Sequence, residues 1–189
     1  RTASDSERRI AHPYFPAAPN LCHFFLQPTP TKPMPTKPMP ITILRLGAPS
    51  AETCARLGGY EDWIAQNLTT ATRSIDIIGG EAPPAHADCR GVILTGSAHS
   101  VNERLPWSEA LRPWMQEAVA RELPVFATCY GHQLLADALG GTVGRTGTRE
   151  YGHTEASVSV DSCLFGGTPD DQIVWMSHGD AVQGAPEGF

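Results

Sequence analysis

The sequence has few of the features that place a protein in a membrane or on a nucleic acid. No apolar run approaches the roughly 20 residues that a membrane-spanning helix needs. The apolar patch at residues 21–26 contains His23 and is too short for the core of a signal peptide. Basic residues number 14 against 20 acidic ones, so the net charge is −6. This balance argues against nucleic-acid or membrane partners recognised through bulk charge.

Paired cysteines are also missing. The number of cysteines is odd, they are widely spaced and none forms a Cys-x-x-Cys motif; they are Cys22, Cys54, Cys89, Cys129 and Cys163. Neither a disulfide framework nor a zinc site is therefore predicted, and a reducing, cytoplasmic compartment fits best. With 189 residues, of which 41% are hydrophobic, the chain is long enough for one domain with a real core and some chain to spare.

The first 40 residues differ from the rest of the chain. They are rich in proline, and Pro-Thr-Lys-Pro-Met occurs at residues 30–34 and again at 35–39. Proline at this density blocks both helices and sheet ladders. We expect residues 1–40 to be a disordered or polyproline-II-like extension, and residues 41–189 to form the folded domain.

From residue 41 apolar strands alternate with amphipathic helices. Strands are predicted at 41–46, 73–78, 91–95 and 124–127, and helices at about 50–68, 108–121 and 131–139, with Pro113 in the first turns of its helix or kinking it. This alternation predicts a doubly wound parallel sheet, in which active sites gather beyond the carboxyl ends of the strands. After residue 141, alternation at 154–160 and a short apolar run at 172–176 predict a small antiparallel section added to that sheet.

Cys129 lies at the most informative position. Residues 123–135 predict a short strand, a tight turn and a helix, with Cys129 at the turn. Unpaired N–H groups and the helix dipole at such a site favour a thiolate and stabilise a developing oxyanion. Gly131 leaves room for the sharp bend, as in other nucleophile elbows. The alternative is a buried, inert thiol.

Four separated segments resemble one known family. They are residues 92–97, the Cys-Tyr-Gly-His-Gln string from Cys129, Tyr-Gly-His at 151–153, and Val-Trp-Met-Ser-His-Gly-Asp at 174–180. Their order and spacing are similar to those of class I glutamine amidotransferases, closest to the glutaminase domain of GMP synthase and its free-standing relatives. The resemblance covers about residues 41–189 and implies a flavodoxin-like α/β fold.

The resemblance implies hydrolysis of the glutamine side-chain amide, with Cys129 as the nucleophile. The backbone N–H groups of Tyr130 and of Ser97 (or Gly96) form the oxyanion hole. Gln133 binds the substrate glutamine, unless it is an ordinary residue of the helix surface. A loop holds the substrate's α-amino and α-carboxylate groups, mainly through its backbone; its residues are Ser177, His178, Gly179 and Asp180.

Histidine roles are less specific. His178 is a ligand or a loop-packing residue, whereas His99, His132 and His153 are expected to be structural or on the surface. No metal or organic cofactor is implied for glutamine hydrolysis. ATP and Mg²⁺ would belong to a synthetase domain or subunit that receives the ammonia.

The chain departs from the family in the histidine that serves as the general base of the catalytic triad. The family uses a His-x-Glu motif well after the Ser-His-Gly-Asp segment, and no histidine follows His178 here. The residues His153-Thr154-Glu155 have the His-x-Glu sequence, but they lie in a different segment of the family pattern. The expectation is a C-terminally truncated domain that is inactive alone, with one sheet edge and one apolar face uncovered.

Two other functions stay open. A γ-glutamyl hydrolase on the same scaffold would cleave γ-glutamyl amides or peptides and shares the cysteine elbow. A non-catalytic binding protein would lack the His-Glu pair altogether.

Overall fold

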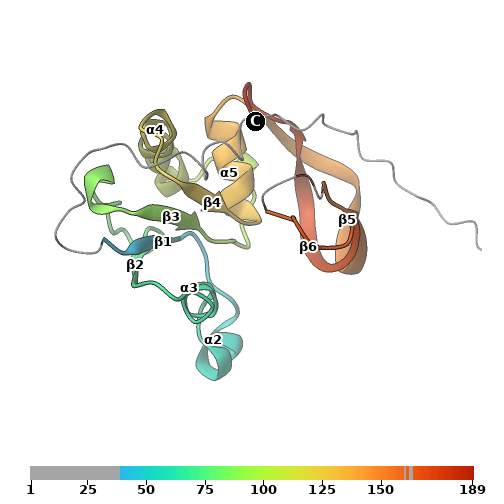
Figure 1. Cartoon of the computed structure of the whole chain (residues 1–189), viewed down its shortest axis with the longest axis horizontal. Helices are drawn as coiled ribbons and strands as arrows, with labels where there is room; N and C mark the ends of the chain where they lie inside the picture. Colours follow the sequence, from blue (N-terminus) through green and yellow to red (C-terminus); the bar gives the residue numbers. More distant parts are fainter. Residues whose placement is uncertain (1–38, 160, 162–163) are drawn as a thin grey trace, which may run out of the picture.

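A computed structural model describes residues 39–159, 161 and 164–189 of the chain; most of the predicted extension, residues 1–38, lies outside them. Figure 1 shows a parallel sheet with helices beside a long hairpin. The sheet has the order β2-β1-β3-β4, and each neighbouring pair is parallel. Its strands are β1 (Ile41–Arg45), β2 (Thr72–Asp76), β3 (Gly91–Leu94) and β4 (Val125–Ala127). The predicted flavodoxin-like α/β architecture is confirmed.

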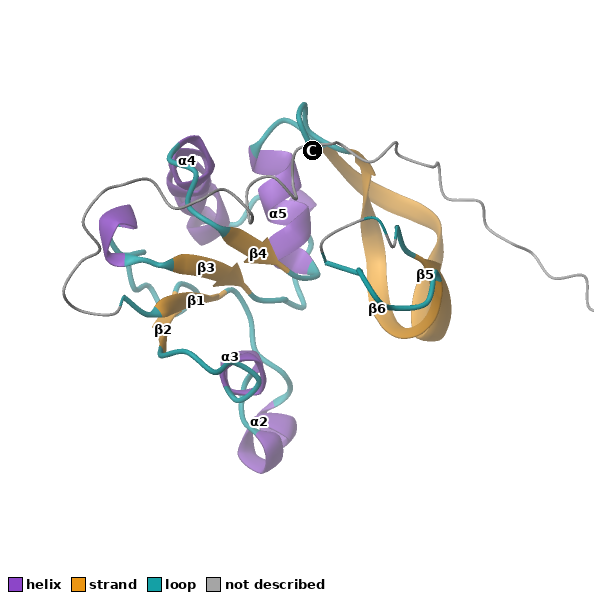
Figure 2. Ribbon diagram, viewed as in Figure 1, coloured by secondary structure: helices purple, strands orange, loops and turns teal. Residues whose placement is uncertain are grey.

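Helices connect these strands (Figure 2). They are α2 (Ala51–Leu57), α3 (Tyr60–Ala65), α4 (Pro106–Ala120) and α5 (Tyr130–Ala138), with 3₁₀ turns η1 (His86–Asp88) and η2 (Val101–Glu103). Pro113 lies in the third turn of α4, not in its first, and its side chain is exposed. Across the described ranges, no helix combines the length and apolarity that a membrane span requires.

The single helix predicted for residues 50–68 is wrong, because two glycines divide it. Ser50 caps α2, its hydroxyl accepting a hydrogen bond from the Thr53 N–H at 3.2 Å. Gly58 then takes a φ of +81°, which ends α2. Gly59 is the N-cap of α3, and its N–H donates to the Asp62 carboxylate at 2.8 Å. The glycines therefore set where α2 ends and α3 begins.

The antiparallel section is longer than predicted and forms a sheet of its own. β5 (Thr142–Ser157) pairs with β6 (Asp171–Gly184), with an irregularity between Arg145 and Glu150. Residues 177–180, predicted as a loop, lie inside β6, where cross-strand pairing supplies the backbone hydrogen bonds. Their Ser-His-Gly-Asp composition is typical of turns, so the sequence pattern does not indicate a strand here.

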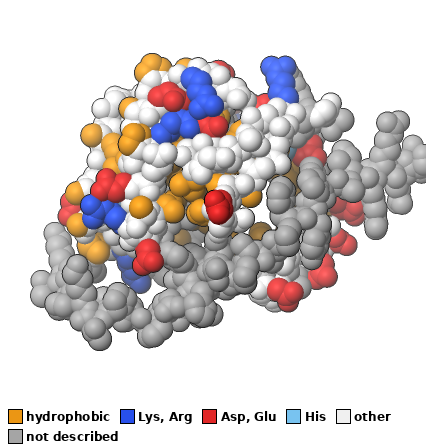
Figure 3. Space-filling model, turned by 90° about the horizontal axis from the view of Figure 1, so that it is seen from above, with side chains coloured by type: hydrophobic (Ala, Val, Ile, Leu, Met, Phe, Trp, Pro, Cys, Tyr) orange, Lys and Arg blue, Asp and Glu red, His pale blue; other side chains and the backbone are white. Residues whose placement is uncertain are grey.

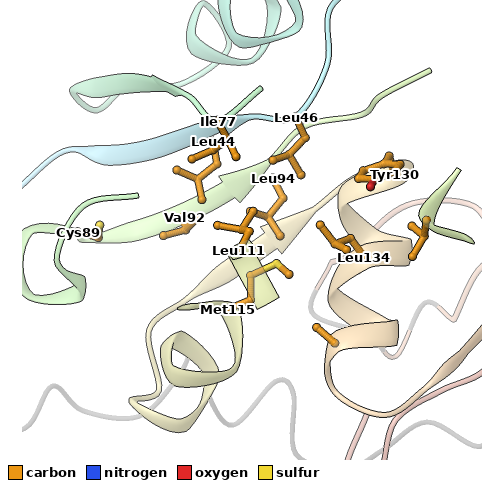
Figure 4. Packing of buried hydrophobic residues seen from close by; sticks show 12 residues of the cluster. Leu44, Leu46, Ile77, Cys89, Val92, Leu94, Leu111, Met115, Tyr130 and Leu134 are labelled. Carbon is orange, nitrogen blue, oxygen red and sulfur yellow. The ribbon is translucent and has the colours of Figure 1, made fainter. Parts of the chain in front are cut away.

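A compact apolar cluster fixes the parallel sheet (Figure 4). Leu44 and Leu94 from the two central strands are completely buried, and Leu111 and Met115 of α4 pack on them. Burying each such side chain contributes about 1.5–3 kcal/mol. Tyr130, the first residue of α5, is 1% exposed and joins the same cluster. The residue after Cys129 is therefore anchored in the core.

Apolar side chains also remain on the surface. Phe126, on the edge strand β4, is 49% exposed, and in the hairpin Tyr151, Ile173 and Trp175 are 65–73% exposed. On the face shown in Figure 3, hydrophobic side chains gather near the middle, with charged groups around them. Apolar surface is therefore present both on the edge strand β4 and on the hairpin.

We expect Tyr130→Phe to leave the free energy of unfolding within about 1 kcal/mol of the parent value. The Tyr130 hydroxyl is buried and has no hydrogen-bond partner among the described residues. Burial raises the pKa of Tyr130, and the neighbouring Ser108 hydroxyl, which donates to the Leu105 carbonyl at 2.8 Å, partly offsets this rise. Tyr130→Ala should cost about 3–5 kcal/mol.

Urea denaturation followed by circular dichroism measures both variants. A loss well above 1 kcal/mol for Tyr130→Phe would mean that the hydroxyl makes a strong hydrogen bond after all.

Candidate active site

Cys129 occupies a strained backbone position between β4 and α5. It is the N-cap of α5, with φ +50° and ψ −118°, and its side chain is exposed. A non-glycine residue rarely adopts such angles, and at functional sites the strain is typically held by the surrounding structure. The turn therefore presents a free thiol at the carboxyl end of the parallel sheet.

Gly131 allows α5 to approach β3. A Cβ at this position would lie 2.6 Å from the Leu94 Cβ and 2.9 Å from the Thr95 carbonyl oxygen. The Gly131 N–H donates to that same carbonyl at 3.2 Å. No other residue fits here without moving the helix, so this contact fixes the start of α5 against the sheet.

The loop after β3 passes beside Cys129. A Cβ on Gly96 would lie 3.4 Å from the Cys129 Cβ and 3.7 Å from its sulfur. On the other side of the loop, a Cβ on Gly47 would lie 2.6 Å from the Ser97 Cα. Gly47, which the sequence analysis did not single out, thus lets the end of β1 support the loop that carries the predicted oxyanion donors.

A cavity of about 950 Å³ opens at this elbow. All the residues predicted for the site line it: Gly96, Ser97, Cys129, Tyr130, Gln133, Ser177, His178, Gly179 and Asp180. They come from the β3 loop, the elbow, α5 and β6, which are far apart in the sequence. The cavity also has walls that were not predicted, from α3 and from residues 98–103.

Asp180 links three elements around the cavity. Its carboxylate accepts a hydrogen bond from the Ser100 hydroxyl at 2.5 Å, and its backbone carbonyl accepts one from the Gln133 side-chain amide at 2.8 Å. Gln133 is only 8% exposed, so the alternative that it is an ordinary helix-surface residue is wrong. The sequence could not reveal Ser100, because its partner lies 80 residues away.

His178 is paired with a carboxylate across the hairpin. Its Nε2 lies 3.1 Å from Glu150 Oε2, and both side chains are less than a quarter exposed. Glu150 and His178 face each other in the β5–β6 register, and the His178 Nδ1 is buried without a hydrogen-bond partner in the described part of the chain. This pair ties the two strands together at the cavity wall.

Two of the other predicted histidines, His99 and His153, pair with neighbouring side chains. His99 lies 3.0 Å from Glu103, with both side chains about half exposed. The backbone N–H of Ser100, and then His99, lower the pKa of that carboxyl. His153 packs edge-on against Trp175, and neither His132 nor His153 lines the cavity.

An α/β sheet with a cysteine elbow, a neighbouring glycine loop and a Ser-His-Gly-Asp strand at one cavity defines an amidotransferase-type site. The chain belongs to the class-I glutamine amidotransferase family: the family model "Glutamine amidotransferase class-I" matches residues 57–189.

Relatives within this family are GMP synthases. The chain is 43% identical over 134 residues to "GMP synthase [glutamine-hydrolyzing]" of Streptomyces avermitilis, covering 69% of this chain and 25% of that protein. It is 40% identical over 151 residues to the Streptomyces coelicolor protein of the same name, covering 79% and 26%. The chain therefore spans about a quarter of the length of these relatives.

Solved structures share the fold. A glutamine amidotransferase from Methylobacillus flagellatus superposes with a TM-score of 0.65 at 25% identity, covering 80% of this chain and 59% of that one. A glutamine amidotransferase from Thermotoga maritima gives 0.61 at 24% identity, covering 75% and 61%.

We expect Gly131→Ala to destabilise the protein by about 1–3 kcal/mol, because its methyl group would overlap Leu94 and the Thr95 carbonyl. Gly147→Ala is the matched control, since nothing lies within 4 Å of a Cβ there; its effect should stay within about 0.5 kcal/mol. Equal effects in thermal or urea unfolding would contradict the close approach of α5 to β3.

Proposed function

We propose that residues 41–189 form the glutamine-binding and amide-cleaving domain of an amidotransferase. The ammonia would pass to a synthetase domain or subunit of the GMP-forming kind, as the names of the relatives suggest. A reducing cytoplasm suits a site whose nucleophile is a free thiol. The observation that carries this proposal is the gathering of all the predicted site residues around one cavity.

In this proposal the Cys129 thiolate attacks the γ-carbonyl carbon of glutamine. The N–H groups of Tyr130 and of Ser97 (or Gly96) receive the developing oxyanion. Ammonia leaves, and water then cleaves the glutamyl thioester to release glutamate. Gln133 and residues 177–180 hold the amino-acid end of the substrate.

Asp180 is the group best suited to the substrate's α-ammonium. Its carboxylate lines the cavity and is oriented by Ser100, and a charge-assisted hydrogen bond is stronger than a neutral one. Because Gln133 holds the backbone of the same residue, the carboxylate has a fixed position before the ligand arrives.

A thiolate of this kind works with a histidine base that a carboxylate orients. The His-x-Glu motif that the family uses after the Ser-His-Gly-Asp segment does not occur within residues 1–189. We therefore propose that this polypeptide, assayed by itself, binds glutamine and hydrolyses it very slowly. Binding without turnover is also what the non-catalytic alternative requires.

We expect Ser100→Ala to weaken glutamine binding about tenfold, the effect of one lost hydrogen bond to a charged group. Ser157→Ala is the matched control, because it removes a Ser–Asp hydrogen bond between β5 and β6, to Asp171 at 2.7 Å. Neither of these two residues lines the cavity. Isothermal titration of glutamine into Cys129→Ala protein measures both. No binding by any of these proteins would refute the proposed function.

We expect residues 1–189 to release ammonia from glutamine at a rate close to that of the Cys129→Ala variant. A coupled glutamate dehydrogenase assay detects the ammonia. Steady release by the parent polypeptide that disappears in Cys129→Ala would overturn the proposal of slow turnover, and would itself establish Cys129 as the nucleophile.

A further inference from the structure

One wall of the cavity comes from α3 and is largely apolar. Tyr60, Trp63 and Ile64 of α3 line it, and all three are only partly buried. A volume of about 950 Å³ is at the upper end of what drug-sized ligands occupy, whereas glutamine is a small amino acid. Its carboxamide and carboxylate groups require polar hydrogen-bond partners rather than apolar surface.

The wall and the reacting sulfur border the same cavity. Burial raises the pKa of Tyr60, and negative charge on Cys129 and Cys54 raises it further. In Figure 1, α3 and the β5–β6 hairpin lie on different sides of the start of α5. The cavity is therefore lined by Asp180 from the hairpin, by Cys129 at the elbow and by the aromatic residues of α3.

The aromatic wall is held in place before any ligand binds. The Trp63 indole N–H donates to the Leu57 carbonyl at 2.6 Å, and the rings of Tyr60 and Trp63 meet edge to face with centroids 5.5 Å apart. Glu61 lies 3.6 Å from the guanidinium of Arg45, which ties α3 to β1. A preorganised apolar surface loses little entropy when a ligand covers it.

We propose that this cavity takes γ-glutamyl amides that carry an aromatic or other apolar group on the amide nitrogen. This inference rests on the proposed function. The amino-acid end lies at the hairpin, the γ-carbonyl lies at Cys129, and the nitrogen substituent packs against Tyr60, Trp63 and Ile64. Glutamine itself fills only the first two positions.

The chemistry is the same as for glutamine and balances without a redox partner. The Cys129 sulfur bonds to the γ-carbonyl carbon, and the C–N bond breaks. The nitrogen keeps the electron pair and takes the proton that the thiol lost, leaving as a free amine. Water then adds to the thioester, the C–S bond breaks, and glutamate and the thiol are formed.

The test measures binding, so it does not depend on turnover. L-glutamine and γ-L-glutamyl anilide are titrated into the full chain carrying Cys129→Ala. We expect the anilide to bind about tenfold more tightly, because its ring covers apolar surface on α3. Adding Trp63→Ala should remove this preference and leave glutamine binding unchanged, whereas Trp63→Phe should keep most of it.

Tyr151→Ala is the matched control, because Tyr151 is an aromatic residue of the same cavity on the hairpin side. It should change the affinities for both ligands by the same factor. Circular dichroism verifies that each variant is folded. Equal or weaker binding of the anilide, or a preference that survives Trp63→Ala, overturns the inference while glutamine binding upholds the proposed function. Absence of binding by both ligands overturns both.

Discussion

The position of Cys129 depends on how closely α5 approaches the central strand β3. Gly131 makes this approach possible, since any side chain there would overlap Leu94 and the Thr95 carbonyl. Tyr130, buried in the apolar cluster, holds the helix from the other side. Both anchors directly follow Cys129, whose backbone has a positive φ of 50°. A packed core thus supports the strain that exposes the thiol.

The second half of the site comes from a hairpin that the parallel sheet does not contain. Asp180 joins it to the rest through the Ser100 hydroxyl and the Gln133 amide. The Glu150–His178 pair holds β5 and β6 together at the cavity wall. The cavity is consequently an interface between two pieces of structure, with the cysteine on one piece and the Ser-His-Gly-Asp strand on the other.

The sequence predicted the parallel strands well, because continuous apolar runs such as 91–95 read as buried strands whatever surrounds them. The prediction of a single helix over residues 50–68 was wrong, because Gly58 and Gly59 divide one amphipathic pattern into two helices. The length of β6 was missed because Ser, His, Gly and Asp are typical of turns, and here only pairing with β5 makes them a strand. Ser100, Glu150 and Tyr60 escaped notice because their roles arise from partners or neighbours distant in sequence.

Long pairing of β5 with β6 has a consequence for local stability. Among the described side chains of these strands, none belongs to the buried apolar cluster, so the hairpin's own ladder and its few links to α5 and Ser100 hold it. Such a segment opens more easily than the sheet, as a cooperative unit of its own. A ligand that bridges Cys129 and Asp180 would stabilise the closed hairpin by mass action. Occupancy of the site would therefore increase the hydrogen-exchange protection of β5 and β6.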